Sequence, residues 1–497
     1  MDLLYKSTRN AECTVTASQA ILKGLADDGG LFVPVSIPKL DVTMDELKNM
    51  NYQQTAYAVM KQFLTDFTEK ELKCCINSAY DSKFDTPLIA PLAKVGDTYH
   101  LELFHGATIA FKDMALSILP HLLVTSAKKN NVQNEIVILT ATSGDTGKAA
   151  LAGFADVPGI KIIVFYPKNG VSKVQELQMV TQKGDNTAVV ALHGNFDNAQ
   201  SGVKALFEDK KLEKELADAG YQFSSANSIN IGRLVPQVVY YVYAYAKLLQ
   251  NEEIAPGEEI NVTVPTGNFG NILAAYYAKQ MGVPIAKLVC ASNENKVLFD
   301  FFQTGKYDKN REFVLTSSPS MDILISSNLE RLIYTIAGED ADKNRTFMES
   351  LKSTGCYEIT TEMKEKLKDF VGGYASEEDT KNTIHDIYHK TGYVMDTHTA
   401  VASHVAKIYR NISGDDRKMV IASTASPYKF AGNVMSAIDE KYNGMDEFAL
   451  VDAMEEISDV KIPNAVHEIR NAKIRHTREC DIDKMEDVVK EILKVEV

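Results

Sequence analysis

The chain has 497 residues, an ordinary globular composition with 45% hydrophobic and 24% charged residues, and a formal net charge of -14. Nucleic acids and anionic membranes bind through basic surfaces, so this charge argues against both as main partners but leaves room for an anionic small substrate in a local pocket. The six cysteines form no Cys-x-x-Cys pair and follow no regular spacing, which argues against a disulfide framework or a bound metal and favours a reducing cytoplasm.

The first hundred residues predict a mixed, mostly helical segment, which we assign as an N-terminal domain over residues 1–95. Its first residues, MDLLYKSTRN, lack the basic and apolar regions of a secretory signal. No later stretch is long and apolar enough for a membrane span, and LVPQVVYYVYAYAKLL is interrupted by Gln237 and by a lysine. We therefore expect a cytoplasmic protein without a membrane segment.

From about Tyr99, short β-branched runs alternate with helical patterns. Strands are expected at residues 135–141, 160–167, 187–194, 259–265, 286–293 and 418–424. This alternation is typical of βαβ units and of open, twisted, mostly parallel sheets covered on both faces. We assign two such α/β domains, a smaller one at 96–225 and a larger one at 226–497. Ligands of these sheets bind at the loops beyond the carboxyl ends of the strands.

The stretch LFHGATIAFKDMALSILP, residues 103–120, places Lys112 between Phe111 and Asp113 at the start of an apolar helix. Lysine is rarely buried, and in dry surroundings its amine tends to lose its proton and become a nucleophile. The alternative is a solvated lysine paired with its neighbour Asp113. This stretch alone leaves both interpretations open.

The loop TSGDTG, residues 142–147, follows the strand expected at 135–141. Its glycines allow close approach of the backbone to a ligand, and the hydroxyls of Thr142, Ser143 and Thr146 suit a carboxylate or phosphate. Asp145 would oppose an anion unless its carboxylate points away. A tight strand-to-helix turn is the alternative.

The loop TGNFGN, residues 266–271, follows the strand expected at 259–265. Gly267 and Gly270 frame a turn whose amides can bind an anion at the positive end of the next helix. The loop lacks the patterns of dinucleotide and nucleoside-triphosphate sites, so it fits a small phosphate group, with a plain turn as the alternative. A third loop, STASPYKF at 423–430, offers the hydroxyls of Ser423, Thr424 and Ser426 to a bound ring, although such clusters are also common in turns.

Together, a nucleophilic lysine, a phosphate nest and hydroxyl-lined loops at successive strand ends suit pyridoxal 5'-phosphate. The lysine would hold the aldehyde as a Schiff base, the nest would hold the phosphate, and a side chain would tune the ring nitrogen.

The chain also resembles the threonine synthase family, which belongs to the fold type II, or tryptophan-synthase-β-like, group of pyridoxal-phosphate enzymes. The similar motifs follow the family's order over nearly the whole chain: STR at 7–9, GLADDGGLFVP at 24–34, LELFHGATIAFKD at 101–113, LTATSGDTGKAA at 139–150, SANSINIGRLVPQVVYY at 225–241, VPTGNFGNILAAYYAK at 264–279, SPSMDI at 318–323, DTHTAVA at 396–402 and STASPYKF at 423–430.

The resemblance implies that Lys112 carries the cofactor, that the loop residues Gly267, Asn268, Phe269, Gly270 and Asn271 bind its phosphate, and that Thr424 lies near its ring nitrogen. A neutral hydroxyl does not keep that nitrogen protonated as an aspartate would, so side reactions such as transamination are less favoured.

The activity that the resemblance implies is that of a carbon-oxygen lyase acting on phosphates, in the last step of threonine biosynthesis. It converts O-phospho-L-homoserine and water to L-threonine and phosphate by γ-elimination and β-replacement, with the freed Lys112 amine moving protons at Cα, Cβ and C4'. The TSGDTG loop would hold the α-carboxylate through Ser143 and Thr146.

The SANSINIGR stretch offers Asn227, Ser228, Asn230 and Arg233 for the substrate phosphate. Arg233 is attractive because a guanidinium grips phosphate with two parallel hydrogen bonds, whereas its alternative role is an ordinary ion pair at a helix start.

Two positions depart from the family's usual sequence, since Ala107 and Thr397 stand where prolines are common. Neither position supplies a functional group, so we expect activity to survive both changes. Rival functions are a threonine-synthase-like phospholyase or a threonine or serine dehydratase, both releasing a 2-oxo acid, and a non-catalytic binding protein on the same fold. We expect a monomer or a homodimer with a small-molecule substrate.

Overall fold

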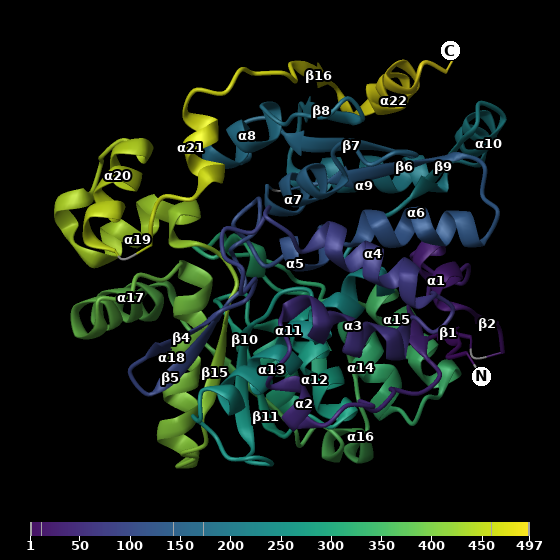
Figure 1. The fold of residues 1–497 in the computed structure, drawn as a ribbon. Helices are drawn as coiled ribbons and strands as arrows, with labels where there is room; N and C mark the ends of the chain where they lie inside the picture. The colour runs from purple at the N-terminus through teal and green to yellow at the C-terminus, as the bar shows by residue number, and fades with distance from the viewer. Residues whose placement is uncertain (1, 11, 143, 172, 459, 496–497) are drawn as a thin grey trace.

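The protein was analysed in a computed structural model that describes all residues except 1, 11, 143, 172, 459 and 496–497. Two mostly parallel sheets, one in the upper and one in the lower half of Figure 1, carry helices between their strands. This architecture confirms the fold class predicted from the alternation of strands and helices.

The upper sheet has five strands in the order β16-β8-β7-β6-β9, and every neighbouring pair is parallel. Its strands are β6 (Glu135–Ala141), β7 (Ile160–Pro167), β8 (Thr187–Leu192), β9 (Tyr221–Ser224) and β16 (Arg478–Cys480). Its helices are α6 (Leu119–Lys129), α7 (Asp145–Phe154), α8 (Lys173–Val180), α9 (Phe196–Glu208), α10 (Lys210–Asp218) and α22 (Met485–Leu493).

Successive residues of β6 point to opposite faces of this sheet, and both faces are covered. Ile136 and Ile138 belong to the main core, which includes residues of α6 and α7. Val137 and Leu139 belong to a separate cluster with residues of α9, α10 and α22. Burial on both faces explains why the strand reads as a continuous apolar run rather than an alternating one.

The lower sheet has six strands in the order β14-β11-β10-β15-β5-β4, parallel except for the β4–β5 pair. Its strands are β4 (Leu92–Val95), β5 (Thr98–Glu102), β10 (Ile260–Pro265), β11 (Ile285–Ser292), β14 (Phe370–Tyr374) and β15 (Met419–Ser423). Its helices include α12 (Gly270–Met281), α13 (Val297–Thr304), α17 (Glu377–Thr391) and α18 (Thr397–Ser413).

The two sheets do not follow the sequence-based ranges 96–225 and 226–497. β5 lies within the first range but pairs with β15 of the lower sheet, and β16 lies within the second range but pairs with β8 of the upper sheet. Because strand pairing joins segments more than 280 residues apart here, no local pattern in the sequence reveals it.

The N-terminal segment combines four helices with a small sheet. It contains α1 (Ala17–Lys23), α2 (Met44–Leu47), α3 (Tyr52–Phe63) and α4 (Glu69–Ala79), and an antiparallel sheet of β1 (Tyr5–Ser7), β2 (Thr14–Val15) and β3 (Phe32–Pro34). All four helices begin with a capping box, at Thr16, Thr43, Asn51 and Thr68, in which side chains and backbone satisfy each other's hydrogen bonds.

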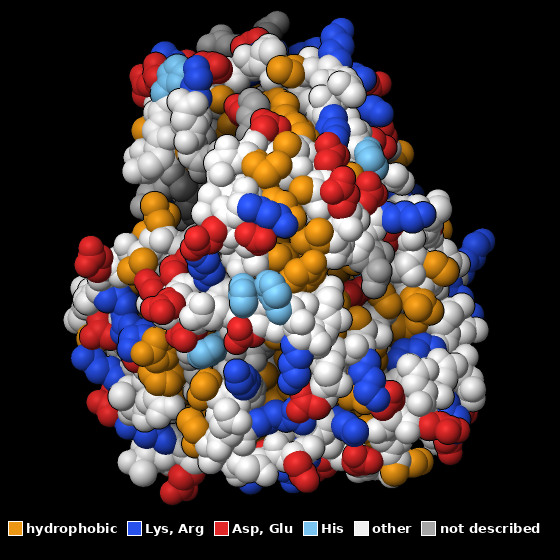
Figure 2. All heavy atoms as spheres, turned by 90° about the vertical axis from the view of Figure 1, so that its left-hand side faces the viewer, with side chains coloured by type: hydrophobic (Ala, Val, Ile, Leu, Met, Phe, Trp, Pro, Cys, Tyr) orange, Lys and Arg blue, Asp and Glu red, His pale blue; other side chains and the backbone are white. Residues whose placement is uncertain are grey.

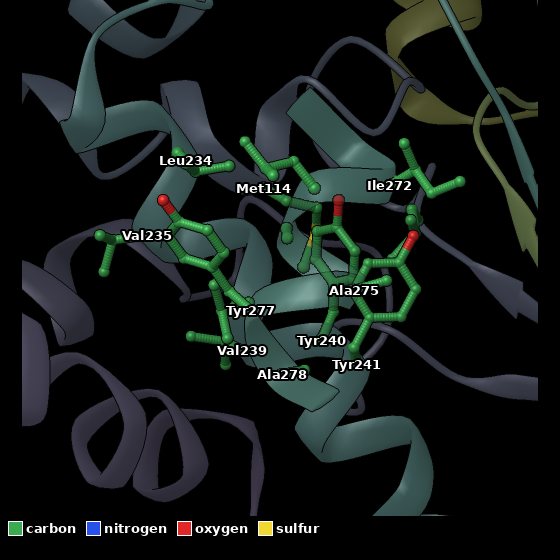
Figure 3. Packing of buried hydrophobic residues seen from close by; sticks show 14 of the residues in the cluster. Met114, Leu234, Val235, Val239, Tyr240, Tyr241, Ile272, Ala275, Tyr277 and Ala278 are labelled. Carbon is green, nitrogen blue, oxygen red and sulfur yellow. The ribbon is translucent and has the colours of Figure 1, made fainter. Parts of the chain in front are cut away.

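The buried helix α11 (Ile231–Gln250) joins the parts of the chain that form the site. It packs on α3, on α12 and on the short helix α5 (Asp113–Leu116), which starts directly after Lys112. Figure 3 shows Tyr240 and Tyr241 of α11 among Met114 of α5 and Ile272 of α12. Among the described residues, no helix is long and apolar enough to cross a membrane, α11 included.

The remaining elements lie in the second half of the chain. They are β12 (Lys306–Asp308), η1 (Pro319–Met321), α14 (Leu329–Ile336), α15 (Ala341–Ser353), β13 (Cys356–Glu358), α16 (Thr361–Glu365), η2 (Pro427–Phe430), α19 (Ala431–Ile438), η3 (Glu440–Tyr442), α20 (Glu447–Ile457), α21 (Asn464–Arg470) and η4 (Ile482–Lys484).

Candidate functional site

The segment that carries Lys112 lies along the STASPYKF loop. The Phe111 amide donates to the Thr424 carbonyl at 2.8 Å, and the Ser426 amide donates to the Ile109 carbonyl at 3.0 Å. Ile109 has a φ of 54°, in the left-handed region that β-branched residues rarely adopt. These contacts hold a strained turn directly before the lysine.

Lys112 is largely enclosed, with 13% of its side chain exposed. Its Nζ lies 3.4 Å from Asp145 Oδ2 and donates to Ser320 Oγ at 3.3 Å. Burial lowers the pKa of Lys112, the charge of Asp145 opposes that shift, and the nearby Lys429 and Arg233 cations add to it. The structure therefore contradicts the solvated alternative and places a potential nucleophile in the site.

Asp113 does not pair with Lys112. Its buried carboxylate accepts hydrogen bonds from the amide and the hydroxyl of Thr108. Burial raises the pKa of Asp113, and the two bonds from Thr108 oppose that shift. A Cβ at Gly106 would lie 2.6 Å from this side chain, so the turn requires glycine there. Asp113 shapes the loop that presents Lys112.

The TSGDTG loop opens α7 and directs Asp145 into the site. The Thr142 hydroxyl accepts from the amides of Gly144 and Gly147, both at 2.9 Å, and so serves the turn itself. Both glycines make room for protein atoms, since a Cβ would meet Gln175 at 2.5 Å or Thr142 at 2.4 Å. Thr146 is partly exposed in the first turn of α7, and Ser143 lies outside the described residues.

The TGNFGN loop leads into the N-terminus of α12. Phe269 has a φ of 66° at the N-cap, where no side chain caps the helix, and its buried ring packs on Phe302 and Phe370. The Phe269 backbone is therefore part of the loop, while its ring packs in the hydrophobic core. Asn268 is exposed, and Gly267 allows the Ser320 carbonyl to approach, since a Cβ there would lie 2.6 Å from that oxygen.

Asn271, in the first turn of α12, has one satisfied and one orphaned polar atom. Its Oδ1 accepts hydrogen bonds from the hydroxyls of Tyr240 and Tyr241, which point the same way in Figure 3. Its Nδ2 is buried and has no hydrogen-bond partner within the described part of the chain. A buried donor without a partner is costly, and together with an uncapped helix N-terminus it fits a bound phosphate group.

The SANSINIGR stretch separates into a helix cap and a buried cation. Asn230 caps α11 through Gly232 and donates to the Ile21 carbonyl at 3.0 Å, so both of its amide atoms already have protein partners. Ser228 is partly exposed and donates to the exposed Asn227 at 3.3 Å.

Arg233 is 4% exposed and donates to the Ala226 carbonyl, while its Nε has no partner among the residues that the structure describes. Burial lowers its pKa to about 10. It forms no ion pair with any carboxylate in the part of the chain that the structure describes, which contradicts its alternative role in an ordinary ion pair. A buried, unpaired guanidinium close enough to repel Lys112 is suited to an anionic ligand.

Three residues of the site were not singled out from the sequence. Ser320 in η1 lies between Lys112 and Asp145 and donates to Asp145 Oδ2 at 2.9 Å. His398 accepts from the Ser320 amide at 3.2 Å and pairs with Asp396 at 2.7 Å, which fixes the position of η1. Lys429 in η2 is fully buried beside Asp145. All three residues occur in motifs shared with the family, SPSMDI, DTHTAVA and STASPYKF, which was the signal available in the sequence.

Comparison with known proteins is consistent with this geometry. The family model of pyridoxal-phosphate dependent enzymes matches residues 83–424, that of the threonine synthase N terminus matches residues 4–80, and that of the threonine synthase C-terminal region matches residues 399–480. The fold and the site thus define a pyridoxal-phosphate-dependent enzyme of fold type II, and the cofactor is pyridoxal 5'-phosphate.

Named relatives align with nearly the whole length of the chain. The Saccharomyces cerevisiae protein named threonine synthase is 33% identical over 99% of this chain and 98% of its own length. The crystal structure of threonine synthase from yeast has a TM-score of 0.89 and 32% identity over 99% of both chains, and that of PLP-bound threonine synthase from Brucella melitensis has a TM-score of 0.85 at 32% identity, again over 99% of both chains. The chain belongs to the threonine synthase family.

Other relatives are longer than this chain. The Homo sapiens protein named threonine synthase-like 1 is 40% identical over 85% of this chain, but the match spans only 58% of that protein.

Proposed function

We propose that the chain converts O-phospho-L-homoserine and water to L-threonine and phosphate. The observation that carries this proposal is the enclosed amine of Lys112, which shares its surroundings with a buried, unpaired Arg233 and an uncapped α12 N-terminus. Two separate groups that favour anions suit a phosphorylated substrate beside a phosphorylated cofactor.

The cofactor has a matching set of residues. Lys112 holds its aldehyde carbon, the α12 amides and the orphaned Asn271 Nδ2 bind its phosphate, and Thr424 faces the ring nitrogen with a neutral hydroxyl. When bound, pyridoxal phosphate supplies an electron sink that stabilises negative charge at the substrate carbons. At the entry to α12, the loop residues Gly267, Asn268 and Phe269 and the first helical residue Gly270 contribute backbone rather than side chains.

The substrate is oriented by its two acidic ends. Arg233 binds the phosphate with its free guanidinium edge, assisted by Asn227 and Ser228, and the first turn of α7 with Thr146 binds the α-carboxylate. Asn230 is omitted because it caps α11. With the substrate held in this way, the freed Lys112 amine accepts the proton from Cα and then moves protons at Cβ and Cγ as phosphate leaves and water adds at Cβ.

The charges of the site favour this substrate class. Lys429 and Arg233 are cations with limited exposure beside the enclosed amine of Lys112, and Asp145 is the carboxylate that contacts both lysines. This local excess of positive charge would attract a phosphorylated amino acid although the protein as a whole carries a net charge of -14. On the face shown in Figure 2, acidic and basic side chains are interspersed. We accordingly propose a small-molecule partner, a cytoplasmic location and a monomer or homodimer.

The test is a product assay with O-phospho-L-homoserine and the cofactor-loaded protein. We expect L-threonine and phosphate in equal amounts. Formation of 2-oxobutyrate and ammonia in place of threonine would identify a phospholyase, and an absence of turnover with intact cofactor binding would indicate a binding protein.

A further inference from the structure

Lys429 is a second lysine of the site, and its side chain is completely buried. Its Nζ donates to the Thr108 carbonyl at 3.1 Å and lies 3.0 Å from Asp145 Oδ1. Lysine is almost never fully buried without a partner, because its ammonium loses the hydration that water provides. The Asp145 carboxylate is the partner of Lys429, so the pair places two opposite charges in a dry part of the site.

Asp145 divides its two oxygens between two groups of partners. Oδ1 faces Lys429 and accepts from Gln175 at 2.8 Å, whereas Oδ2 accepts from Ser320 at 2.9 Å and lies 3.4 Å from Lys112. Burial tends to raise the pKa of Asp145, but the Lys429 ammonium, followed by Lys112, holds it well below the usual range. The carboxylate is thus an anion whose shorter ion pair is with Lys429.

We propose that Lys429 is a positioning residue that neutralises the Asp145 carboxylate and thereby leaves Lys112 as an uncharged amine, able to attack an aldehyde. The inference rests on the proposed role of Lys112 in holding the cofactor. Through its bond to Thr108, Lys429 also fixes the turn that presents Lys112.

The groups that face Lys112 support this partition of charge. Asp145 of α7 favours the ammonium form of Lys112, Lys429 of η2 and Arg233 of α11 oppose it, and Ser320 of η1 offers only a neutral hydroxyl. Without Lys429, Lys112 would be the closest cation to an anionic Asp145, and its ammonium form would be stabilised. Without the charge of Asp145, two ammonium groups would share a dry site, and Lys112 would lose its proton more readily.

The experiment measures how fast the cofactor-free protein forms a Schiff base with added pyridoxal 5'-phosphate between pH 6 and 10. The rate is followed by visible absorbance, and borohydride reduction with peptide mass analysis identifies the modified lysine. The variants are Lys429→Met, Asp145→Asn and the double variant. The control is Lys441→Met, because Lys441 is 64% exposed and pairs with Asp439 away from the site.

We expect the pH midpoint of the rate to rise by about one unit in Lys429→Met, which corresponds to about tenfold less uncharged amine at neutral pH. In Asp145→Asn the midpoint should fall, and in the double variant it should return toward the parent value, because the unbalanced carboxylate is gone. Lys441→Met should match the parent.

A midpoint that stays the same in Lys429→Met, or rises in Asp145→Asn, would overturn the inference. A purely structural role for Lys429 would predict additive losses in the double variant rather than a reversal. If Lys429→Met does not fold, the comparison is made with Lys429→Gln, which also removes the charge and for which the same rise of the midpoint is expected. Because loading is read without substrate, a protein that loads on Lys112 but forms no threonine would refute the proposed activity and leave this inference standing.

Discussion

Replacing Arg233 with methionine should weaken substrate binding while it stabilises the protein without substrate. Arg233 is 4% exposed, and among the described residues its Nε has no partner and its guanidinium has one hydrogen bond, to Ala226. An unsatisfied buried donor costs about 1–3 kcal/mol, so the free energy of unfolding should rise by a similar amount when methionine fills the space. The melting temperature of the substrate-free variant should therefore exceed that of the parent.

The loss in function follows from the two hydrogen bonds that the arginine would make to the substrate phosphate. Charge-assisted bonds contribute about 1.5–3 kcal/mol each, so the loss of both lowers kcat/KM by roughly 10²- to 10⁴-fold. Arg233→Lys keeps the charge but loses the parallel pair, so it should cost about one bond, or roughly 10- to 150-fold. The effect should lie mainly in KM if Arg233 binds substrate and transition state equally.

The assay compares steady-state kinetics with O-phospho-L-homoserine, inhibition by inorganic phosphate, and melting curves. The absorption band of the bound cofactor serves as the control for an intact site in each variant. A kcat/KM within threefold of the parent in both variants would refute the role of Arg233 in binding phosphate. A lower melting temperature in Arg233→Met would contradict the view that this charge is unpaired.

Three further outcomes are expected. Thr424→Asp should protonate the ring nitrogen of the cofactor and shift its visible spectrum, whereas an unchanged spectrum with full activity would show that this residue does not face the ring. Thr397→Pro loses a bond from the Thr397 hydroxyl to a loop carbonyl at 2.7 Å but suits the first turn of α18, so we expect the melting temperature to change little and activity to persist. Burial lowers the pKa of His105, but its hydrogen bonds to Asp85 and Glu102 overcome that effect and raise the pKa to about 9. The charged His105 therefore stabilises the folded protein fully below about pH 6.5, and this contribution is lost as the pH rises to 9. The gap in melting temperature between the parent and His105→Gln should therefore shrink from pH 6 to pH 9.5, and a constant gap would count against this ion pair.

The strands were predictable because burial on both faces leaves a continuous apolar run in the sequence. The six strands expected from the sequence all occur, and β6 and β7 have the expected bounds. The strand β14 was not expected, since its sequence FVGGY contains two glycines. A Cβ at Gly373 would lie 2.4 Å from Val405, so packing against α18 requires the glycine that hides the strand.

The parts of the site that lie within a single loop of the sequence were predictable. Lys112 and the TGNFGN loop do lie where their patterns indicate, near a strand end and at a helix N-terminus. The direction of Asp145 was not predictable, because its partners Ser320 and Lys429 lie 175 and more residues away in the sequence. The Thr397 hydroxyl makes a structural bond to the Ser317 carbonyl, a contact that no local pattern in the sequence indicates.

The most direct measurement of the central claim is product analysis in water enriched in oxygen-18, with the parent and Lys112→Ala side by side. The parent should form L-threonine and phosphate in equal amounts, with the label in the threonine hydroxyl, and Lys112→Ala should form neither. Near-normal threonine formation by Lys112→Ala, or labelled homoserine or 2-oxobutyrate as the main product of the parent, would contradict the account.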